Sequence, residues 1–187
     1  MKTMKSIYEL LSIVGSIEGW LSYHEQFALL NLPSMVDHLP GDIVEIGSFK
    51  GKSTIALALG SALMSTKKSP IYAIDPFILC PSNFFEDNVK NHGCENLIIP
   101  IKKYSTEAYD DCPNSIAAIF IDGDHEYPSV KHDIIHYAPR VVKGGLIAFH
   151  DYCENWPGVI QAVDELCNNE NFEYVTLYDS LLFVRKL

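Results

Sequence analysis

The feature that most constrains this chain is the alternation of short apolar, β-rich segments with helical ones. The β-rich segments are residues 42–46, 71–74, 97–101, 116–121 and 146–149, with a turn expected at Gly144-Gly145 before the last of them. Helical segments are expected at 53–64, 84–91, 130–141 and 159–167. This alternation predicts an α/β fold with a mostly parallel sheet and helices on both faces. The last two segments, 172–178 and 181–184, are typical of an antiparallel hairpin.

The first 40 residues have a different pattern. Apolar residues at Ile7, Leu10, Leu11 and Val14 follow helical spacing, and Ser22 to Glu25 form a capping-box pattern at the start of a second helix. Pro40-Gly41 then ends the helical region. We therefore expect residues 1–40 to form helices that pack on the core or cover the site, and residues 41–187 to form the main domain.

Charge and cysteine usage limit the classes of partner. The net charge is −10, and gripping nucleic-acid phosphates requires clustered cations, so we expect no nucleic-acid partner. No apolar run reaches the ~18–20 residues of a membrane helix, and the basic start, residues 1–5, leads into mixed sequence and not into a secretory signal. The five cysteines are odd in number and form no C-x-x-C pair, which favours reduced thiols in a cytoplasmic protein. A small-molecule partner and a homo-oligomer, built through the apolar N-terminal helices, remain as expectations.

Polar residues follow each of the five predicted parallel strands. In open α/β sheets, ligands bind outside the carboxyl ends of the strands, where the strand order reverses. We therefore expect one largely acidic site built from these strand ends. Its members are Gly47 to Gly51, Asp75, Tyr104-Ser105-Thr106, then Asp122, Asp124 and His125, and finally His150 and Asp151.

The segment from Gly47 to Gly51 joins a strand to a helix and predicts a ligand-binding turn. It has three residues between its glycines, one fewer than a phosphate-binding P-loop, and Phe49 replaces the second glycine of a dinucleotide fingerprint. Asp75 lies near the spacing expected for an acid that binds ribose hydroxyls. The set fits a nucleoside with a ribose and no pyrophosphate, such as S-adenosylmethionine. A tight turn without a ligand is the alternative reading.

Three segments together resemble a known family. Residues 43–54 are similar to the first motif of class I S-adenosylmethionine-dependent methyltransferases. Residues 120–127 and 143–152 resemble the branch that includes macrocin-type sugar O-methyltransferases, and Glu18-Gly19-Trp20-Leu21 is similar to the lead-in of that branch. The resemblance covers roughly residues 17–187. It implies a Rossmann-like, seven-stranded sheet that ends in an antiparallel hairpin.

The resemblance also implies roles in cofactor binding. Gly47, Ser48 and Gly51 would line the methionine part of S-adenosylmethionine, with Glu45 beneath them. Asp75 would hold the ribose hydroxyls, and Ser105 would lie near the adenine. Ser53, at the start of the following helix, and Asp122 complete the expected cofactor-binding set.

Metal-dependent relatives place one carboxylate after the fourth strand and an acidic pair after the fifth, which points here to Asp122, His150 and Asp151. His150 stands where relatives often have an acid, so the expected site has mixed nitrogen and oxygen ligands. Mg²⁺ prefers oxygen ligands, whereas a site that includes an imidazole nitrogen also suits Mn, Fe or Zn. His125 resembles the general base of the sugar-methylating relatives, and its ordinary pKa of about 6.5 suits proton transfer near neutral pH.

These observations predict an enzyme that moves a methyl group from S-adenosylmethionine to a hydroxyl of a small molecule or sugar. Asp122 and His125 are the expected catalytic residues, acting with a divalent metal. His125 capping the next helix is the structural alternative for that residue. For the whole chain, the alternatives are a non-catalytic S-adenosylmethionine-binding protein and an NAD-dependent oxidoreductase.

Overall fold

The computed structural model describes residues 6–187, so the basic start on which the expectation about a secretory signal partly rests lies outside the described residues. One seven-stranded sheet has the order β3-β2-β1-β4-β5-β7-β6. All neighbouring strands up to β5 are parallel, and β7 pairs antiparallel with both β5 and β6. The predicted α/β class, mostly parallel with a terminal antiparallel hairpin, is confirmed. The strands are β1 (Asp42–Ile46), β2 (Ile71–Ile74), β3 (Ile98–Ile101), β4 (Ile116–Ile121), β5 (Val141–Phe149), β6 (Phe172–Tyr178) and β7 (Leu181–Lys186).

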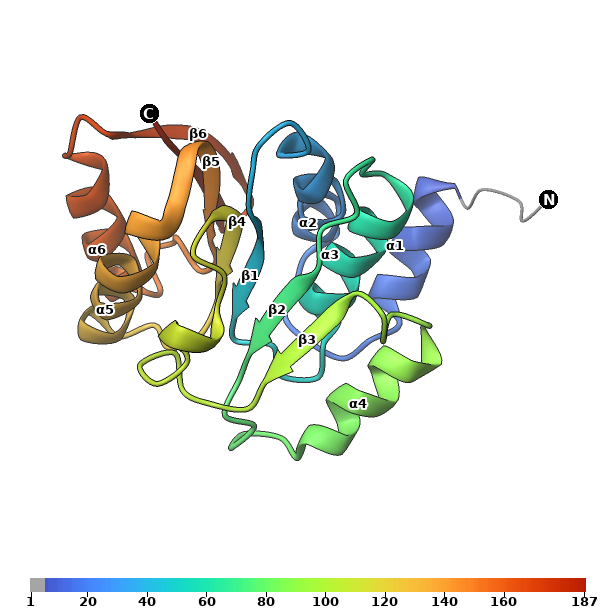
Figure 1. Cartoon of the computed structure of the whole chain (residues 1–187). Helices are drawn as coiled ribbons and strands as arrows, with labels where there is room; N and C mark the ends of the chain where they lie inside the picture. The colour runs from blue at the N-terminus through green and yellow to red at the C-terminus, as the bar shows by residue number, and fades with distance from the viewer. Residues whose placement is uncertain (1–5) are drawn as a thin grey trace.

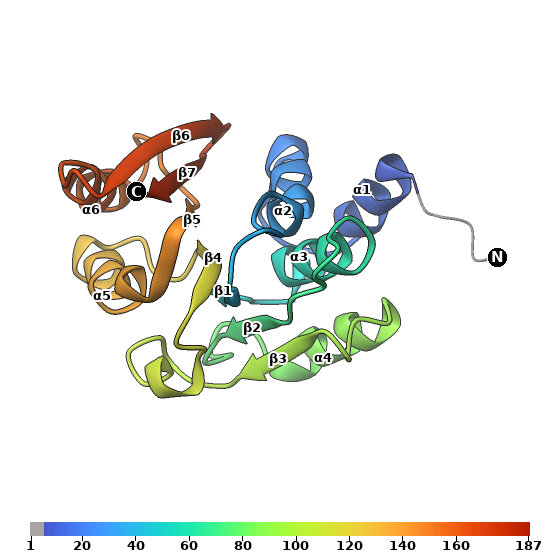
Figure 2. The same ribbon diagram turned by 45° about the horizontal axis from the view of Figure 1, so that its top comes forward.

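Helices cover both faces of the sheet (Figures 1 and 2). One apolar cluster packs the first four helices against one face, and a second packs α5 and α6 against the other. The helices are α1 (Ile7–Gly15), α2 (Tyr23–Met35), α3 (Lys52–Leu63), α4 (Ser82–Asn91), α5 (Tyr127–Tyr137) and α6 (Pro157–Cys167), with short 3-10 turns η1 (Tyr109–Asp111) and η2 (Ala138–Arg140). The central strand β4 is buried along its whole length, as its continuous apolar sequence predicts.

The two N-terminal helices both begin at capping boxes. Ser6 caps α1 with Glu9, and Ser22 caps α2 with Glu25, each side chain satisfying the other residue's backbone N–H. Both helices pack on α3. The helices α2 and α3 pack closely where Gly60 meets Leu30. A Cβ on Gly60 would lie 2.1 Å from the carbonyl oxygen of Leu30, so only glycine fits there.

The expected turn at Gly144-Gly145 is wrong. Both glycines lie inside β5, which begins at Val141, a residue that the helical pattern had included. The register against β4 shifts between Ile116 and Ala118, so β5 bulges there. A Cβ on Gly145 would lie 2.7 Å from Val141 Cγ1 and 2.8 Å from the carbonyl oxygen of Val142 within β5, and 2.9 Å from the carbonyl oxygen of Ala117 in β4, so the bulge leaves room only for glycine.

All five cysteines are free, in agreement with the expectation of reduced thiols. Within residues 6–187, no helix combines the length and apolar character needed to cross a bilayer.

Candidate active site

The strand order reverses at β1, which pairs with β2 on one side and β4 on the other. The carboxyl ends of β1, β2, β4 and β5 therefore meet at one edge of the sheet, as expected for a ligand site in such a fold. The glycine-containing loop follows β1. Gly47 has φ +91° and Gly51 has φ +88°, a region that glycine adopts without strain.

Asp75, at the end of β2, holds the shape of this loop. Its Oδ2 accepts hydrogen bonds from the backbone nitrogens of Ser48, at 3.0 Å, and Phe49, at 2.7 Å. Its Oδ1 accepts one from the backbone nitrogen of Phe77, at 2.6 Å. The loop and Asp75, which the sequence assigns to one ligand site, are therefore in direct contact. The role of Asp75 toward ribose hydroxyls stays a prediction.

The loop also contacts the end of β4. A Cβ on Gly47 would lie 1.9 Å from the carbonyl oxygen of Asp122 and 2.9 Å from the backbone nitrogen of Gly123. No side chain fits in that space. Glycine at this position therefore allows the loop to lie directly against Asp122.

Glu45 is fully buried in β1 beneath the loop. Its Oε2 accepts hydrogen bonds from the hydroxyls of Ser48, at 2.8 Å, and Thr54, whereas its Oε1 has no hydrogen-bond partner within residues 6–187. Burial raises the pKa of Glu45 to about 7, against the hydroxyls of Ser53, Thr54 and Ser48, which favour the ionised form. Glu45 is therefore a buried acid with one unused oxygen below the predicted cofactor loop.

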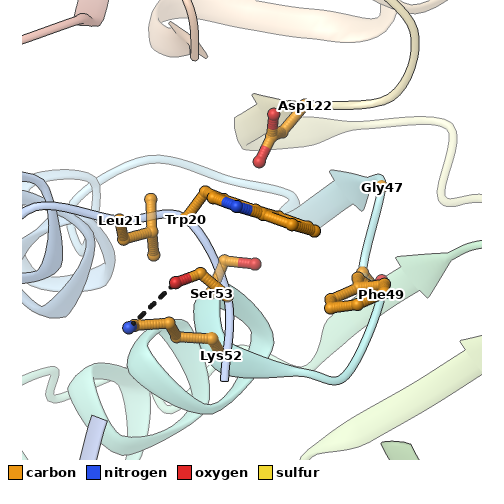
Figure 3. A pocket seen from close by; sticks show the side chains of 9 residues that line it. Trp20, Leu21, Gly47, Phe49, Lys52, Ser53 and Asp122 are labelled. Carbon is orange, nitrogen blue, oxygen red and sulfur yellow. Dashed lines mark hydrogen bonds between the residues drawn. The ribbon is translucent and has the colours of Figure 1, made fainter. Parts of the chain in front are cut away.

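A pocket lies between the glycine loop and the segment that joins α1 to α2 (Figure 3). Trp20 extends across it, with Asp122 on one side and Ser53 and Lys52 on the other. The indole lies 5.1 Å from the Phe49 ring, centroid to centroid. The lining residues are Gly19, Trp20, Leu21, Gly47, Ser48, Phe49, Lys52, Ser53 and Asp122.

The segment carrying Trp20 is fastened to the loop by two lysines. Lys50 forms an ion pair with Glu18, at 2.6 Å, and Lys52 Nζ donates a hydrogen bond to the carbonyl oxygen of Gly19, at 3.2 Å. The sequence analysis does not place Gly19, Trp20 and Leu21 in the site. The resemblance of this segment to the lead-in of the family could have indicated them. Ser105, the expected adenine contact, is not part of this pocket; its carbonyl oxygen accepts a hydrogen bond from the Tyr137 hydroxyl, at 2.7 Å.

A cluster of acids and histidines follows β4 and β5, whose last residues Ile121 and Phe149 are paired in register. His125 Nε2 lies 2.8 Å from Asp151 Oδ2 and 3.8 Å from Asp122 Oδ1. Ligand-type atoms of Asp122, His125 and Asp151 all lie within 4.8 Å of one another. Three residues expected from the sequence to be functional are thus brought together by two adjacent strands.

His150 lies beneath this group and is only 6% exposed. Its Nδ1 is 3.2 Å from Asp122 Oδ1 and 3.1 Å from Asp151 Oδ2, and its Nε2 is 3.4 Å from Oε2 of Glu25. Burial by itself would lower the pKa of His150, but the carboxylates of Asp122, Asp151 and Glu25 outweigh it and raise that pKa to about 12. Glu25 belongs to α2 and was assigned from the sequence only to a helix cap.

The two carboxylates also control the charge of His125. Asp122 and Asp151 raise the pKa of His125 to about 9, so in the ion-free protein the ring is protonated at neutral pH. Burial would raise the pKa of Asp151, but His125 and His150 outweigh it and hold that pKa below its usual range. His125 also packs against Trp156, with ring centroids 4.2 Å apart and the two ring planes tilted by 31°.

Two observations fit a divalent cation at Asp122, His125 and Asp151. His125 Nε2 is buried and lies beside oxygens of both aspartates, 2.8 Å from Asp151 Oδ2 and 3.8 Å from Asp122 Oδ1. Asp151 has φ +59°, a conformation that non-glycine residues adopt mainly where the surroundings hold them. One imidazole nitrogen and two carboxylates, with ligand-type atoms within 4.8 Å of one another, form a donor set of the kind that cations take. Asp124 points elsewhere, accepting a hydrogen bond from the Ser129 hydroxyl at 2.6 Å.

Comparison with known proteins identifies the family. A family model described as a methyltransferase domain matches residues 44–152. The uncharacterized protein R132 of Acanthamoeba polyphaga mimivirus is 34% identical over an alignment of 156 residues, which covers 78% of this chain and 68% of that protein.

Similar solved structures include the O-methyltransferase NovP, with a TM-score of 0.79 at 17% identity over 88% of this chain and 80% of that chain. An O-methyltransferase from Bacillus cereus in complex with SAH gives 0.76 at 14% identity over 100% and 94% of the two chains. TomG from Streptomyces achromogenes in complex with SAM gives 0.73 at 14% identity over 99% and 92%. The protein therefore belongs to the methyltransferase-domain family, with the fold of the class I S-adenosylmethionine-dependent methyltransferases.

Proposed function

We propose that the protein transfers a methyl group from S-adenosylmethionine to a hydroxyl oxygen of a small molecule or sugar. The observation that carries the proposal is that Asp122 belongs to two parts of the site. This residue lines the pocket beside the glycine loop and also belongs to the cluster with His125 and Asp151. A cofactor held by the loop would therefore lie next to groups able to orient an acceptor and take its proton. The O-methyltransferase names of NovP and TomG are in line with this reaction.

In the reaction, the acceptor oxygen attacks the methyl carbon of the sulfonium in line with the carbon–sulfur bond. A carbon–oxygen bond forms, the carbon–sulfur bond breaks, and the electron pair returns to sulfur, giving S-adenosylhomocysteine. The acceptor hydroxyl loses its proton as it attacks, and we propose His125 Nε2 as the group that takes it. A positioned base of this kind contributes typically 10²–10⁴-fold to the rate.

A divalent cation fits the oxygens of Asp122 and Asp151, and when bound it would supply Lewis-acid lowering of the pKa of the acceptor hydroxyl. His125 Nε2 can either complete such a ligand set or accept a proton. We assign it the proton, because two carboxylates already provide the oxygens that hard cations prefer. Neutralising the charge of these carboxylates would also return the pKa of His125 toward neutrality, as a base requires.

The sequence-based assignment of His150 as a metal ligand remains a prediction. In the structure both of its ring nitrogens face carboxylates, on opposite sides of the ring. We therefore favour a role in which His150 holds Asp122 and Asp151 in place. Glu45, Gly47, Ser48, Gly51, Ser53, Asp75 and Ser105 keep their predicted roles toward the cofactor.

Thermal unfolding tests the cofactor directly. A ligand at ~100 times its dissociation constant adds about 2.7 kcal/mol to the unfolding free energy, which corresponds to roughly 5–10 °C in Tm for a domain of this size. We expect this shift with S-adenosylmethionine and with S-adenosylhomocysteine, and none with NAD or ATP. The reverse pattern would overturn the proposal. Transfer of a labelled methyl group to a panel of hydroxylated metabolites then separates an enzyme from a protein that only binds the cofactor.

A further inference from the structure

Glu25 is a buried carboxylate in the first turn of α2, 3% exposed. It closes the capping box of that helix: its Oε2 accepts a hydrogen bond from the backbone nitrogen of Ser22, at 2.7 Å, and its own backbone nitrogen donates to the Ser22 hydroxyl, at 3.2 Å. It lies outside residues 44–152, the segment that the family model matches. The local motif accounts for the start of the helix.

The same carboxylate makes contacts that a helix cap does not need. Its Oε1 accepts hydrogen bonds from both the backbone nitrogen of Ser180, at 3.0 Å, and the Ser180 hydroxyl, at 2.7 Å. Its Oε2 lies 3.4 Å from His150 Nε2. Glu25 thus connects α2, the residue after β5 and the turn between β6 and β7.

The capping box of α1 gives a comparison at the protein surface. Glu9 of α1 accepts hydrogen bonds from the backbone nitrogen of Ser6, at 2.6 Å, and from the Ser6 hydroxyl, at 3.0 Å, yet Glu9 is exposed. The same four-residue motif therefore works at the surface. Because burying a carboxylate is costly unless it is paired, the burial of Glu25 calls for partners beyond the cap: Ser180 donates two hydrogen bonds to it, and His150 is the basic side chain beside it.

We infer that Glu25 is a positioning residue for the active site, acting through His150 on Asp122 and Asp151. This inference rests on the proposed function. The His150 ring lies between carboxylates on two sides, with Glu25 at Nε2 and the two aspartates at Nδ1. Removing the Glu25 carboxylate charge beside Nε2 would leave the buried His150 ring with carboxylates on one side only. The ring could then shift, and the orientation of the two aspartates would change with it. Replacing a residue that orients metal ligands without binding the metal itself typically changes metal affinity or activity 10–100-fold.

The test uses Glu25→Gln in the full chain, with Glu9→Gln as the matched capping-box control. For Glu25→Gln we expect kcat to fall and the dissociation constant of Mn²⁺, measured by calorimetry, to rise, each by about 10–100-fold. The KM for S-adenosylmethionine should change less than these two values, because the glycine loop is untouched and Asp122 is the one affected residue of the pocket lining. Glu9→Gln should leave all three values unchanged. Should Glu25→Gln fail to fold, Ser180→Ala removes one hydrogen bond to the same carboxylate and should shift the same values in the same direction.

A double-mutant cycle tests the route through His150. If Glu25 acts through this ring, then adding Glu25→Gln to His150→Gln should produce little further loss of kcat or Mn²⁺ affinity. Fully additive losses would overturn the inference, and so would an active Glu25→Gln variant that matches Glu9→Gln. A wild-type protein that neither binds Mn²⁺ nor transfers a methyl group would instead overturn the proposed function, and the inference with it.

Discussion

The Nε2 atom of His125 lies 2.8 Å from Oδ2 of Asp151, although the two residues follow different strands of the sheet. The contact exists because β4 and β5 run parallel and end at the same edge. It places an imidazole beside the two carboxylates of the candidate metal site.

Replacing His125 by alanine should reduce methyl transfer by about 10²–10⁴-fold, because the variant lacks the group that accepts the acceptor's proton. Binding of S-adenosylhomocysteine should be unchanged, since His125 is not part of the pocket beside the glycine loop. Initial rates and calorimetric titration measure the two effects. The exposed His38 provides the control, as His38→Ala; unchanged turnover in His125→Ala would remove the base assignment.

Removing divalent ions with a chelator should lower turnover by about 100-fold or more, because charge stabilisation by a metal is worth several kcal/mol. Adding back Mg²⁺ or Mn²⁺ should restore it. Binding of S-adenosylhomocysteine, measured on the same chelated sample, serves as the control and should persist. Full activity after exhaustive chelation would mean that Asp122 and Asp151 work without an ion.

Substituting Gly47 by alanine should abolish cofactor binding and cost several kcal/mol of unfolding free energy. The added Cβ would lie 1.9 Å from the carbonyl oxygen of Asp122, so the loop must separate from β4. Gly93→Ala is the matched control, because Gly93 also has positive φ (+67°) but nothing within 4 Å of an added Cβ. It should cost about 1–2 kcal/mol, the strain term alone. Equal losses in the two variants, measured by denaturant unfolding, would contradict the steric argument.

Replacing Trp20 by alanine should weaken binding of S-adenosylmethionine about 10-fold, equivalent to about 1.4 kcal/mol. The indole forms one wall of the pocket and contacts Phe49 of the loop. Calorimetric titration gives the dissociation constants. Tyr8→Ala removes a similarly exposed aromatic ring from α1, away from the pocket, and should have no effect. An unaltered dissociation constant in Trp20→Ala would exclude this residue from the cofactor site.

Glu45→Gln should change how stability depends on pH. The pKa of this carboxyl rises from an ordinary value of 4.5 to about 7 in the folded state, through burial. Between these two pH values the unfolded chain releases the proton while the folded protein keeps it, so rising pH favours unfolding of the wild type. From pH 4.5 to 7.5 the variant should therefore gain about 2–4 kcal/mol relative to wild type. Urea unfolding at both pH values measures the gain. Parallel pH profiles would show that Glu45 ionises normally; the exposed Glu95, as Glu95→Gln, provides the control.

Much of the fold could be predicted from the sequence, because it depends on local patterns. Apolar segments such as 116–121 gave the strands, and Ser22 with Glu25 marked the start of α2. The grouping of Asp122, His125 and Asp151 could also be predicted, since residues that follow parallel strands meet at one edge of the sheet. The bulge at Gly144 and Gly145 could not, because two glycines in sequence do not distinguish a turn from a close approach of strands.

What the sequence by itself determined is therefore the order of strands and helices along the chain, together with the residues that end each strand. Only the tertiary structure decided which distant segments complete the site. Trp20 reaches the pocket, and Glu25 reaches His150, because α1 and α2 pack on α3 beside the switch point of the sheet. Contacts of this kind depend on how whole helices pack against the sheet, and no short-range spacing in the chain encodes them.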